Sequence, residues 1–103
     1  MYKVNVLGVD YEVIFCTALD NKDLIDASGL CNVYLKTIYI NTFGIEATQE
    51  DTNFLKETLR HELVHAFAYE SGLWGQSWAK DEEIVDWIAL MFPKLNALFN
   101  ILA

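Results

Sequence analysis

The first sixteen residues alternate in a way that predicts a β-hairpin. Residues 2–7 switch between apolar and polar side chains, as a half-buried strand does. Residues 8–10 carry a turn signal, and residues 11–16 are rich in the aromatic and β-branched side chains that favour strands. The first strand is expected to direct one face toward a core, the face that carries Tyr2, Val4 and Val6.

A polar segment separates this hairpin from a second one. Residues 17–29 are expected to form a loop that holds at most a helical turn. Residues 31–35 and 37–41 are again apolar and β-branched, so they predict two strands that turn at Lys36. The order in which the four strands pair cannot be read from this pattern.

The spacing of apolar residues then changes from two to the helical period. Thr48 can cap a helix whose first turn is acidic, and Gly72 supplies a stop signal. The apolar positions of this long helix are Phe54, Leu55, Leu59, Leu63, Ala66 and Phe67.

A second helix is expected from about Asp81. An aromatic loop over residues 73–79, with Trp74 and Trp78, precedes it. Pro93 is expected to end or kink this helix, and residues 94–102 then predict a short apolar C-terminal helix. The apolar face of the second helix is expected to carry Val85, Ile88, Ala89 and Phe92.

Together these elements predict an α+β fold, in which a small antiparallel or mixed sheet packs on two long helices. The 103 residues fit a single domain spanning residues 1–103, and a hydrophobic fraction of 53% argues for a folded chain. The net charge of −8 comes with only seven basic residues, which are spread singly. A nucleic-acid partner is therefore not expected, because such proteins carry a basic patch.

The N-terminus lacks the apolar core of a signal peptide, and no stretch looks like a membrane span, so a cytoplasmic protein without a membrane partner is expected. Cys16 and Cys31 are expected to be buried free thiols in a reducing compartment, although a disulfide between neighbouring strands stays possible. A structural zinc site built from both cysteines and both histidines is disfavoured, because the cysteines are not a close pair.

The strongest chemical signal is the sequence His61-Glu62-Leu63-Val64-His65, an HExxH motif inside the first long helix. Residues i and i+4 share one helix face, so the two imidazoles can bind one zinc ion. Glu62 lies beside that face, where a carboxylate can take a proton from water. These two histidines are the only ones in the chain. The alternative to a zinc site is a core helix in which the two histidines have ordinary hydrogen-bond partners.

A catalytic zinc site needs a third protein ligand, and the acidic start of the second helix offers candidates. Measured from Val85, Glu82 lies about 60° away and Glu83 roughly 160° away on a helix of 3.6 residues per turn. Glu82 is therefore the expected ligand, with Glu83 open as the alternative if the first turn is irregular. Asp86 lies one turn beyond Glu82, where it can accept the second N–H of an imidazole. Ordinary helix capping would explain the same acidic cluster without a metal.

HExxH on one helix, a glutamate on the next and an aspartate four residues later resemble the gluzincin pattern found in thermolysin, with a slightly shorter spacing. Nearly the whole chain resembles the small phage- and prophage-encoded minigluzincins, a group of zincin-like metallopeptidases. The stretches that carry the resemblance are residues 29–40, 58–67 and 81–86.

The resemblance implies that His61, His65 and Glu82 bind Zn²⁺ and that Glu62 is the general base. Larger gluzincins add a histidine or tyrosine that stabilises the oxyanion, and no further histidine exists here, so that donor is absent or is a tyrosine that the sequence does not identify. Zincins commonly bind an extended peptide along an edge strand, and either strand of the second hairpin could do this.

Two functions are consistent with the sequence. The first is zinc-dependent hydrolysis of a peptide bond in a peptide or protein substrate, and the intact Glu62 favours it. The second is a zincin-fold module that cuts little or nothing and acts as a phage-encoded protein-binding partner, for which the aromatic loop and acidic surface would serve. The natural substrate and the oligomeric state are not readable from the sequence.

Overall fold

The four predicted strands form one sheet, whose order along the hydrogen-bonded neighbours is β1-β2-β4-β3. Strand β2 pairs with β4 in parallel, whereas the outer pairs β1·β2 and β3·β4 are antiparallel. The sheet is therefore mixed, and β1 and β3 are its edges. The strand bounds are β1 Tyr2–Val6, β2 Val9–Cys16, β3 Gly29–Asn32 and β4 Thr37–Asn41.

The computed structural model describes residues 2–73 and 78–102 of the chain. Residues 74–77 of the predicted aromatic loop, Trp74 among them, lie outside this range. Of the predicted loop over residues 17–29, a 3₁₀ turn, η1 (Lys22–Leu24), is the one helical part.

Both hairpins differ from the prediction in where they turn. The first turns at Leu7 and Gly8, which both have positive φ angles of 51° and 93°, so Val9 and Asp10 already belong to a strand. In the second hairpin β3 begins at Gly29, two residues earlier than expected, and ends at Asn32, three residues earlier than expected. The Asn32 side chain accepts hydrogen bonds from two backbone N–H groups of the following turn, and this ends the strand.

Two long helices follow, α1 (Gln49–Glu70) and α2 (Glu82–Leu102), with a short 3₁₀ turn η2 (Trp78–Lys80) before the second. The predicted cap of α1 is confirmed, because the Thr48 side chain accepts a hydrogen bond from the Asp51 N–H. Gly72, with a φ angle of 96°, follows the end of α1. The Asp81 side chain accepts from the Ile84 N–H and so caps the start of α2.

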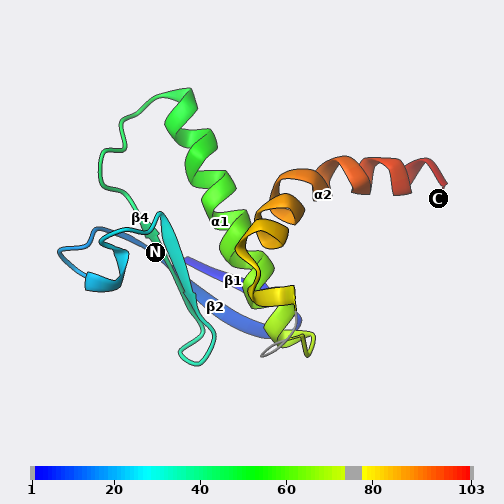
Figure 1. Ribbon diagram of the computed structural model, residues 1–103, viewed down its shortest axis with the longest axis horizontal. Coiled ribbons are helices and arrows are strands. Elements are labelled where there is room, and N and C mark those ends of the chain that lie inside the picture. Colours follow the sequence, from blue (N-terminus) through cyan, green and yellow to red (C-terminus); the bar gives the residue numbers. More distant parts are fainter. Residues whose placement is uncertain (1, 74–77, 103) are drawn as a thin grey trace.

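Helix α2 runs through Pro93 without a break, so the prediction of a separate helix over residues 94–102 is wrong. A proline inside a helix removes one backbone hydrogen bond and favours a kink. The helix axis changes direction in its middle, and the C-terminal part points away from the rest of the protein (Figure 1).

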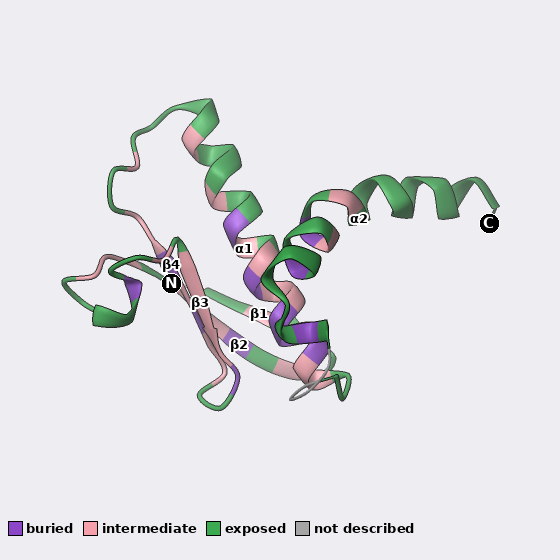
Figure 2. Ribbon diagram, in the orientation of Figure 1, coloured by how far each residue is buried: buried purple, intermediate pink, exposed green. Residues whose placement is uncertain are grey.

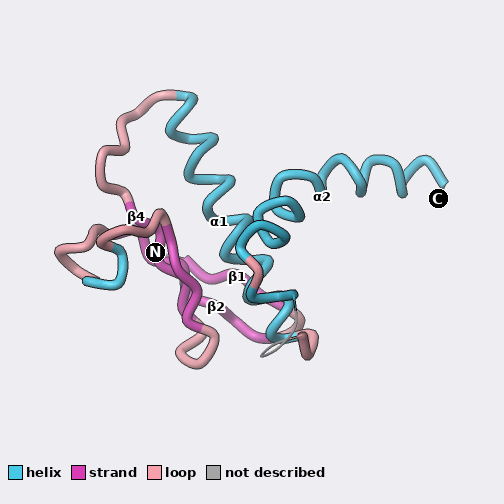
Figure 3. The backbone as a smooth tube through the Cα atoms, viewed as in Figure 1, coloured by secondary structure: helices cyan, strands magenta, loops and turns pink. Residues whose placement is uncertain are grey.

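The core lies between the sheet and α1. It is built from the end of β1, the inward faces of β2 and β4, and α1, and it contains Val6, Tyr11, Val13, Ile38, Ile40 and Ala66. Helix α1 packs against the sheet on one side and against α2 on the other, so it is the middle layer (Figures 1 and 3). Figure 2 colours the whole C-terminal part of α2 as exposed.

Several predicted burial sites are more open than expected. Phe54, Phe67 and Phe92 are exposed rather than part of a core face. Cys16 and Cys31 are free thiols, as expected, but they are only partly buried. Burial nevertheless raises the pKa of Cys31 to about 12, so its thiol is protonated at neutral pH.

Helix α2 also corrects the expectation that no segment resembles a membrane span. By length and composition alone, Glu82–Leu102 is long and apolar enough to cross a bilayer. A single helix of this kind is weak evidence for a membrane span, so this property does not assign a location.

Candidate metal centre

The HExxH motif occupies the fourth and fifth turns of α1, well inside a regular helix. Its 3.6-residue period brings the rings of His61 and His65 to the same face, with centroids 5.0 Å apart in an edge-to-face arrangement. Both imidazoles are largely covered, since only 15% and 11% of their side-chain surfaces remain exposed.

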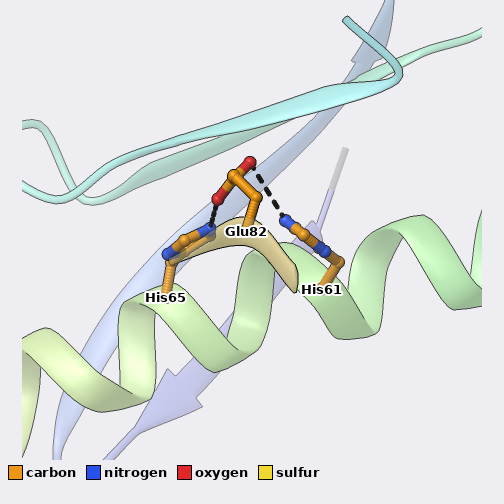
Figure 4. A group of neighbouring side chains, drawn as sticks. All are labelled: His61, His65 and Glu82. Atoms are coloured by element: carbon orange, nitrogen blue, oxygen red, sulfur yellow. Dashed lines mark hydrogen bonds and ion pairs between the residues drawn. The ribbon is translucent and has the colours of Figure 1, made fainter. Parts of the chain in front are cut away.

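Glu82, at the first residue of α2, completes a three-residue cluster with these histidines (Figure 4). Its Oε1 lies 2.6 Å from Nε2 of His65, and its Oε2 lies 3.4 Å from Nε2 of His61. The potential ligand atoms of the three side chains all lie within 4.8 Å of one another. Glu83 is exposed and does not belong to the cluster, so of the two glutamates it is Glu82 that faces the histidines.

The other ring nitrogen of each histidine faces an oxygen atom. His65 Nδ1 lies 3.0 Å from the Ala79 carbonyl oxygen, and His61 Nδ1 lies 3.3 Å from Oδ1 of Asp86. A carbonyl can only accept, so Nδ1 of His65 donates this hydrogen bond. This orients each ring with Nε2 toward Glu82, which is the arrangement that outer partners impose on metal-binding histidines.

The donor set fits a zinc ion. Two imidazoles and one carboxylate, with a fourth position open, are a known ligand set of catalytic zinc. Two ligands about 2 Å from a tetrahedral zinc ion are separated by about 3.3 Å, close to the 3.4 Å between His61 and Glu82. The 2.6 Å contact between His65 and Glu82 is a hydrogen bond, so these two groups would separate by less than 1 Å to bind an ion.

Glu62 lies next to this cluster but does not join it. Only 6% of the residue is exposed, and its Oε2 faces the start of β3 near Gly29. Burial raises the pKa of the Glu62 carboxyl to about 7; the nearby His61 opposes this shift and Glu82 adds to it. A carboxyl with such a pKa can both accept and return a proton near neutral pH.

A cleft of about 360 Å³ opens onto these residues. One wall is α1, the second is the start of α2, and the third is the loop that leads into β3. Among the described residues that line it there is no lysine or arginine, and there are five carboxylates: Asp26, Glu57, Glu62, Glu82 and Asp86. The cleft is therefore an acidic environment that favours cationic groups.

The sequence predicted His61, Glu62, Glu82 and Asp86, which line this cleft, but not the role of Gly29 or of the Ala79 carbonyl. A Cβ atom at Gly29 would meet Thr58 Cγ2 and the Tyr39 carbonyl oxygen at 3.0 Å and Glu62 Oε2 at 3.2 Å, so the glycine permits the close approach of β3 to α1. A glycine at the edge of a strand pattern is a signal for such an approach. The Ala79 carbonyl carries no comparable signal. No tyrosine is among the described residues that line the cleft, so an oxyanion donor of that type is not identified.

Comparison with known proteins adds no further information on the site. The chain has no match among protein-family profiles, curated proteins or solved structures. A function must therefore be argued from the geometry and chemistry of the site itself.

Proposed function

We propose that the chain is a zinc-dependent peptidase with a gluzincin-like site. The observation that carries this proposal is the convergence of His61, His65 and Glu82 in one cluster beside the buried Glu62. Three of these residues, His61, Glu62 and Glu82, line the same cleft. Two histidines alone would be explained by ordinary packing. A carboxylate from a second helix that contacts both imidazoles, and an oxygen partner for each Nδ1, are expected of a metal site, and helix capping alone does not require them.

In this proposal His61, His65 and Glu82 hold the zinc ion. The bound metal would supply Lewis acidity toward a substrate carbonyl and toward water. Glu62 takes a proton from the attacking water and passes it to the departing amine, since burial sets its pKa near 7. Asp86 and the Ala79 carbonyl keep the imidazoles oriented through their Nδ1 atoms.

Support for a peptide as substrate comes from the surroundings of the cleft. Strand β3 is an edge strand, and its first residue, Gly29, lines the cleft. An extended peptide can add to the exposed edge of such a strand by backbone hydrogen bonds. The carboxylates of Asp26 and Glu57 at the same opening favour peptides with lysine or arginine near the cut bond.

The proposal extends to the kind of protein. A mixed sheet covered by an HExxH helix, with a second helix that supplies a glutamate, agrees with a zincin-like core of the minigluzincin type. We propose a phage-type, cytoplasmic peptidase whose substrate is a peptide or protein.

Zinc analysis combined with Glu62→Gln tests this function. Native protein purified without chelator and supplied with zinc should hold about one equivalent, and His61→Ala should not. Glu62→Gln should keep its zinc and its fold but lose cleavage of peptides, detected by mass spectrometry of a peptide mixture, by on the order of 10²-fold or more.

A matched control is Glu50→Gln, which removes an exposed carboxylate from the same helix but lies outside the cleft and the metal cluster. It should keep zinc and most of the activity. A wild type with well under one zinc would contradict the proposed site. Bound zinc without cleavage of any peptide would contradict the enzyme and favour the protein-binding alternative.

A further inference from the structure

The second cavity of the protein is an apolar groove of about 660 Å³ between α1 and α2. Helix α1 contributes Leu63, Val64 and Phe67, and α2 contributes Ile88, Phe92 and Leu95. Arg60 is the one charged residue that lines it in the described part of the chain. The described residues that line the groove do not include any that line the cleft of the candidate metal centre, so this inference does not depend on the proposed function.

The groove continues into an apolar stripe that the described residues leave uncovered from Phe92 onward. Ile88, Phe92, Leu95, Phe99 and Leu102 follow one another at alternating spacings of four and three, as in the seam of packed helices. Val85 and Ala89, beside the start of this stripe, are buried against α1. Every residue from Phe92 to Leu102 is exposed, although among the residues of that segment only Lys94 is charged.

We propose that this face joins two copies of the chain in an antiparallel dimer through α2. In this arrangement the free C-terminal half of α2 from each copy covers the groove of the other copy. The twofold axis passes near Leu95, in the middle of the stripe. The interface is then isologous, so one face supplies both the projecting helix and the groove that receives it.

Three properties of the chain favour a second copy as the occupant. The groove and the free helix are both apolar and belong to the same chain, so each copy brings what the other lacks. The acidic residues that give the chain its charge of −8 do not line this face, so two copies can meet there without like-charge repulsion.

The third property is area. About six large side chains that are each roughly half exposed, with 150–250 Å² for an aromatic one, offer on the order of 600 Å² per copy, near the roughly 800 Å² per partner of a stable interface. Exposed apolar patches of this size mark interaction sites in soluble proteins.

A lipid bilayer is the less favoured occupant. Glu82 and Asp86 at the start of α2 contact the histidines, so a span would have to begin after them and would contain Lys94, Asn96 and Asn100. An interfacial helix would need a polar face rich in lysine and arginine to bind anionic lipid, and this helix has one lysine.

Light scattering or sedimentation of the full chain tests the dimer. Wild type should have a mass of about 24 kDa, twice the 11.8 kDa of the chain, over roughly 10–200 µM. Phe99→Lys should shift it to the monomer mass. The control Leu19→Lys alters a side chain that is 98% exposed in the loop after β2, and it should stay dimeric.

Phe99 contacts no buried core, so an unchanged circular dichroism spectrum is expected for its variant. Independent of this, Leu95→Cys should form a disulfide-linked dimer on mild oxidation, whereas Leu19→Cys should not.

A monomeric wild type would overturn the proposal, and so would a dimer that Phe99→Lys leaves intact. A monomer that floats with phosphatidylcholine vesicles would identify the bilayer as the occupant and equally overturn it. A dimer without the Leu95→Cys cross-link would overturn the antiparallel arrangement.

Discussion

At the scale of single residues, the site depends on which carboxylate of α2 reaches the histidines. Glu82 and Glu83 are neighbours in sequence, yet one helical step of 100° separates their directions. The Glu82 carboxylate touches both imidazoles, even though 73% of its side-chain surface is exposed. Asp86, one turn later, contacts the far nitrogen of His61.

Zinc affinity in three variants should follow this geometry. Glu82→Ala should weaken binding most, because it removes a ligand. Asp86→Asn should cost about 10-fold, within the ~10–100-fold range typical of outer partners. Glu83→Ala should change affinity less than about fivefold, as expected of an exposed surface charge. Competitive titration against a chelating dye measures all three, and a larger loss in Glu83→Ala than in Glu82→Ala would contradict the assignment.

Gly29 is a second position at which a single side-chain atom would disturb the packing around the site. Gly29→Ala puts a methyl group within 3.0 Å of the Tyr39 carbonyl oxygen, and this backbone atom cannot simply rotate away. We expect a loss of about 1–3 kcal/mol in the free energy of unfolding, typical of overpacking, and a displaced Glu62 carboxylate. Urea unfolding and peptide cleavage measure the two effects.

The control for this substitution is Ser28→Ala, since Ser28 lines the same cleft and already has a Cβ atom. It should leave stability nearly unchanged. Equal stability of wild type and Gly29→Ala would mean that β3 does not approach α1 so closely.

At the scale of elements, the C-terminal end of α1 is held to the sheet by one polar cluster. Glu70 accepts hydrogen bonds from the Tyr11 hydroxyl of β2 at 2.6 Å and from Lys36 of the β3–β4 turn at 2.7 Å. The Lys36 ammonium also lies 4.7 Å from the centre of the Tyr69 ring. A glutamate at this end of a helix is unfavourable for the helix dipole, and these partners offset that.

This cluster predicts a pH-dependent stability. The hydrogen bonds from Lys36 and Tyr11 hold the pKa of Glu70 below its ordinary value of 4.5. Its contribution is therefore complete above pH 4.5 and is lost as the pH falls through the lower pKa of the folded state. Glu70→Gln should lower the urea midpoint at pH 7, and the difference from wild type should shrink as the pH drops below 4.5.

Glu57→Gln removes an exposed carboxylate from the same helix and is the control. Its urea midpoint should stay near that of wild type across the pH range. A Glu70→Gln difference that grew toward low pH would contradict the sign of the pKa shift.

At the scale of the whole molecule, the candidate metal centre joins two helices that otherwise meet through few buried side chains. His61 and His65 belong to α1 and Glu82 to α2, so an ion bound by the three would cross-link the helices. Ligands that bind only the folded state add stability, by about 2.7 kcal/mol at 100 times the dissociation constant.

Removal of zinc with a chelator should therefore lower the melting temperature, and added zinc should restore it. The His61→Ala variant should melt at the same temperature with and without chelator. An identical response of this variant and of wild type would show that the effect of the metal lies elsewhere.

The sequence by itself determined what depends on near neighbours along the chain. Strand alternation and the Thr48 cap are local properties, and so is the i, i+4 pair of histidines, because a single helix fixes their relation. Helix phase separated Glu82 from Glu83 for the same reason. The hairpin turns and the bounds of β3 were wrong by one to three residues, since side-chain contacts such as those of Asn32 decide them.

Only the tertiary structure decided what depends on segments far apart in sequence. Pairing of β2 with β4 made β3 the edge strand, and packing of β3 on α1 gave Gly29 its role. The Ala79 carbonyl met His65 only because η2 folds back on α1. The exposure of α2 beyond Phe92 could likewise not be predicted from the sequence. Apolar periodicity identifies a helix face that is expected to be buried, but it does not identify the partner that buries it.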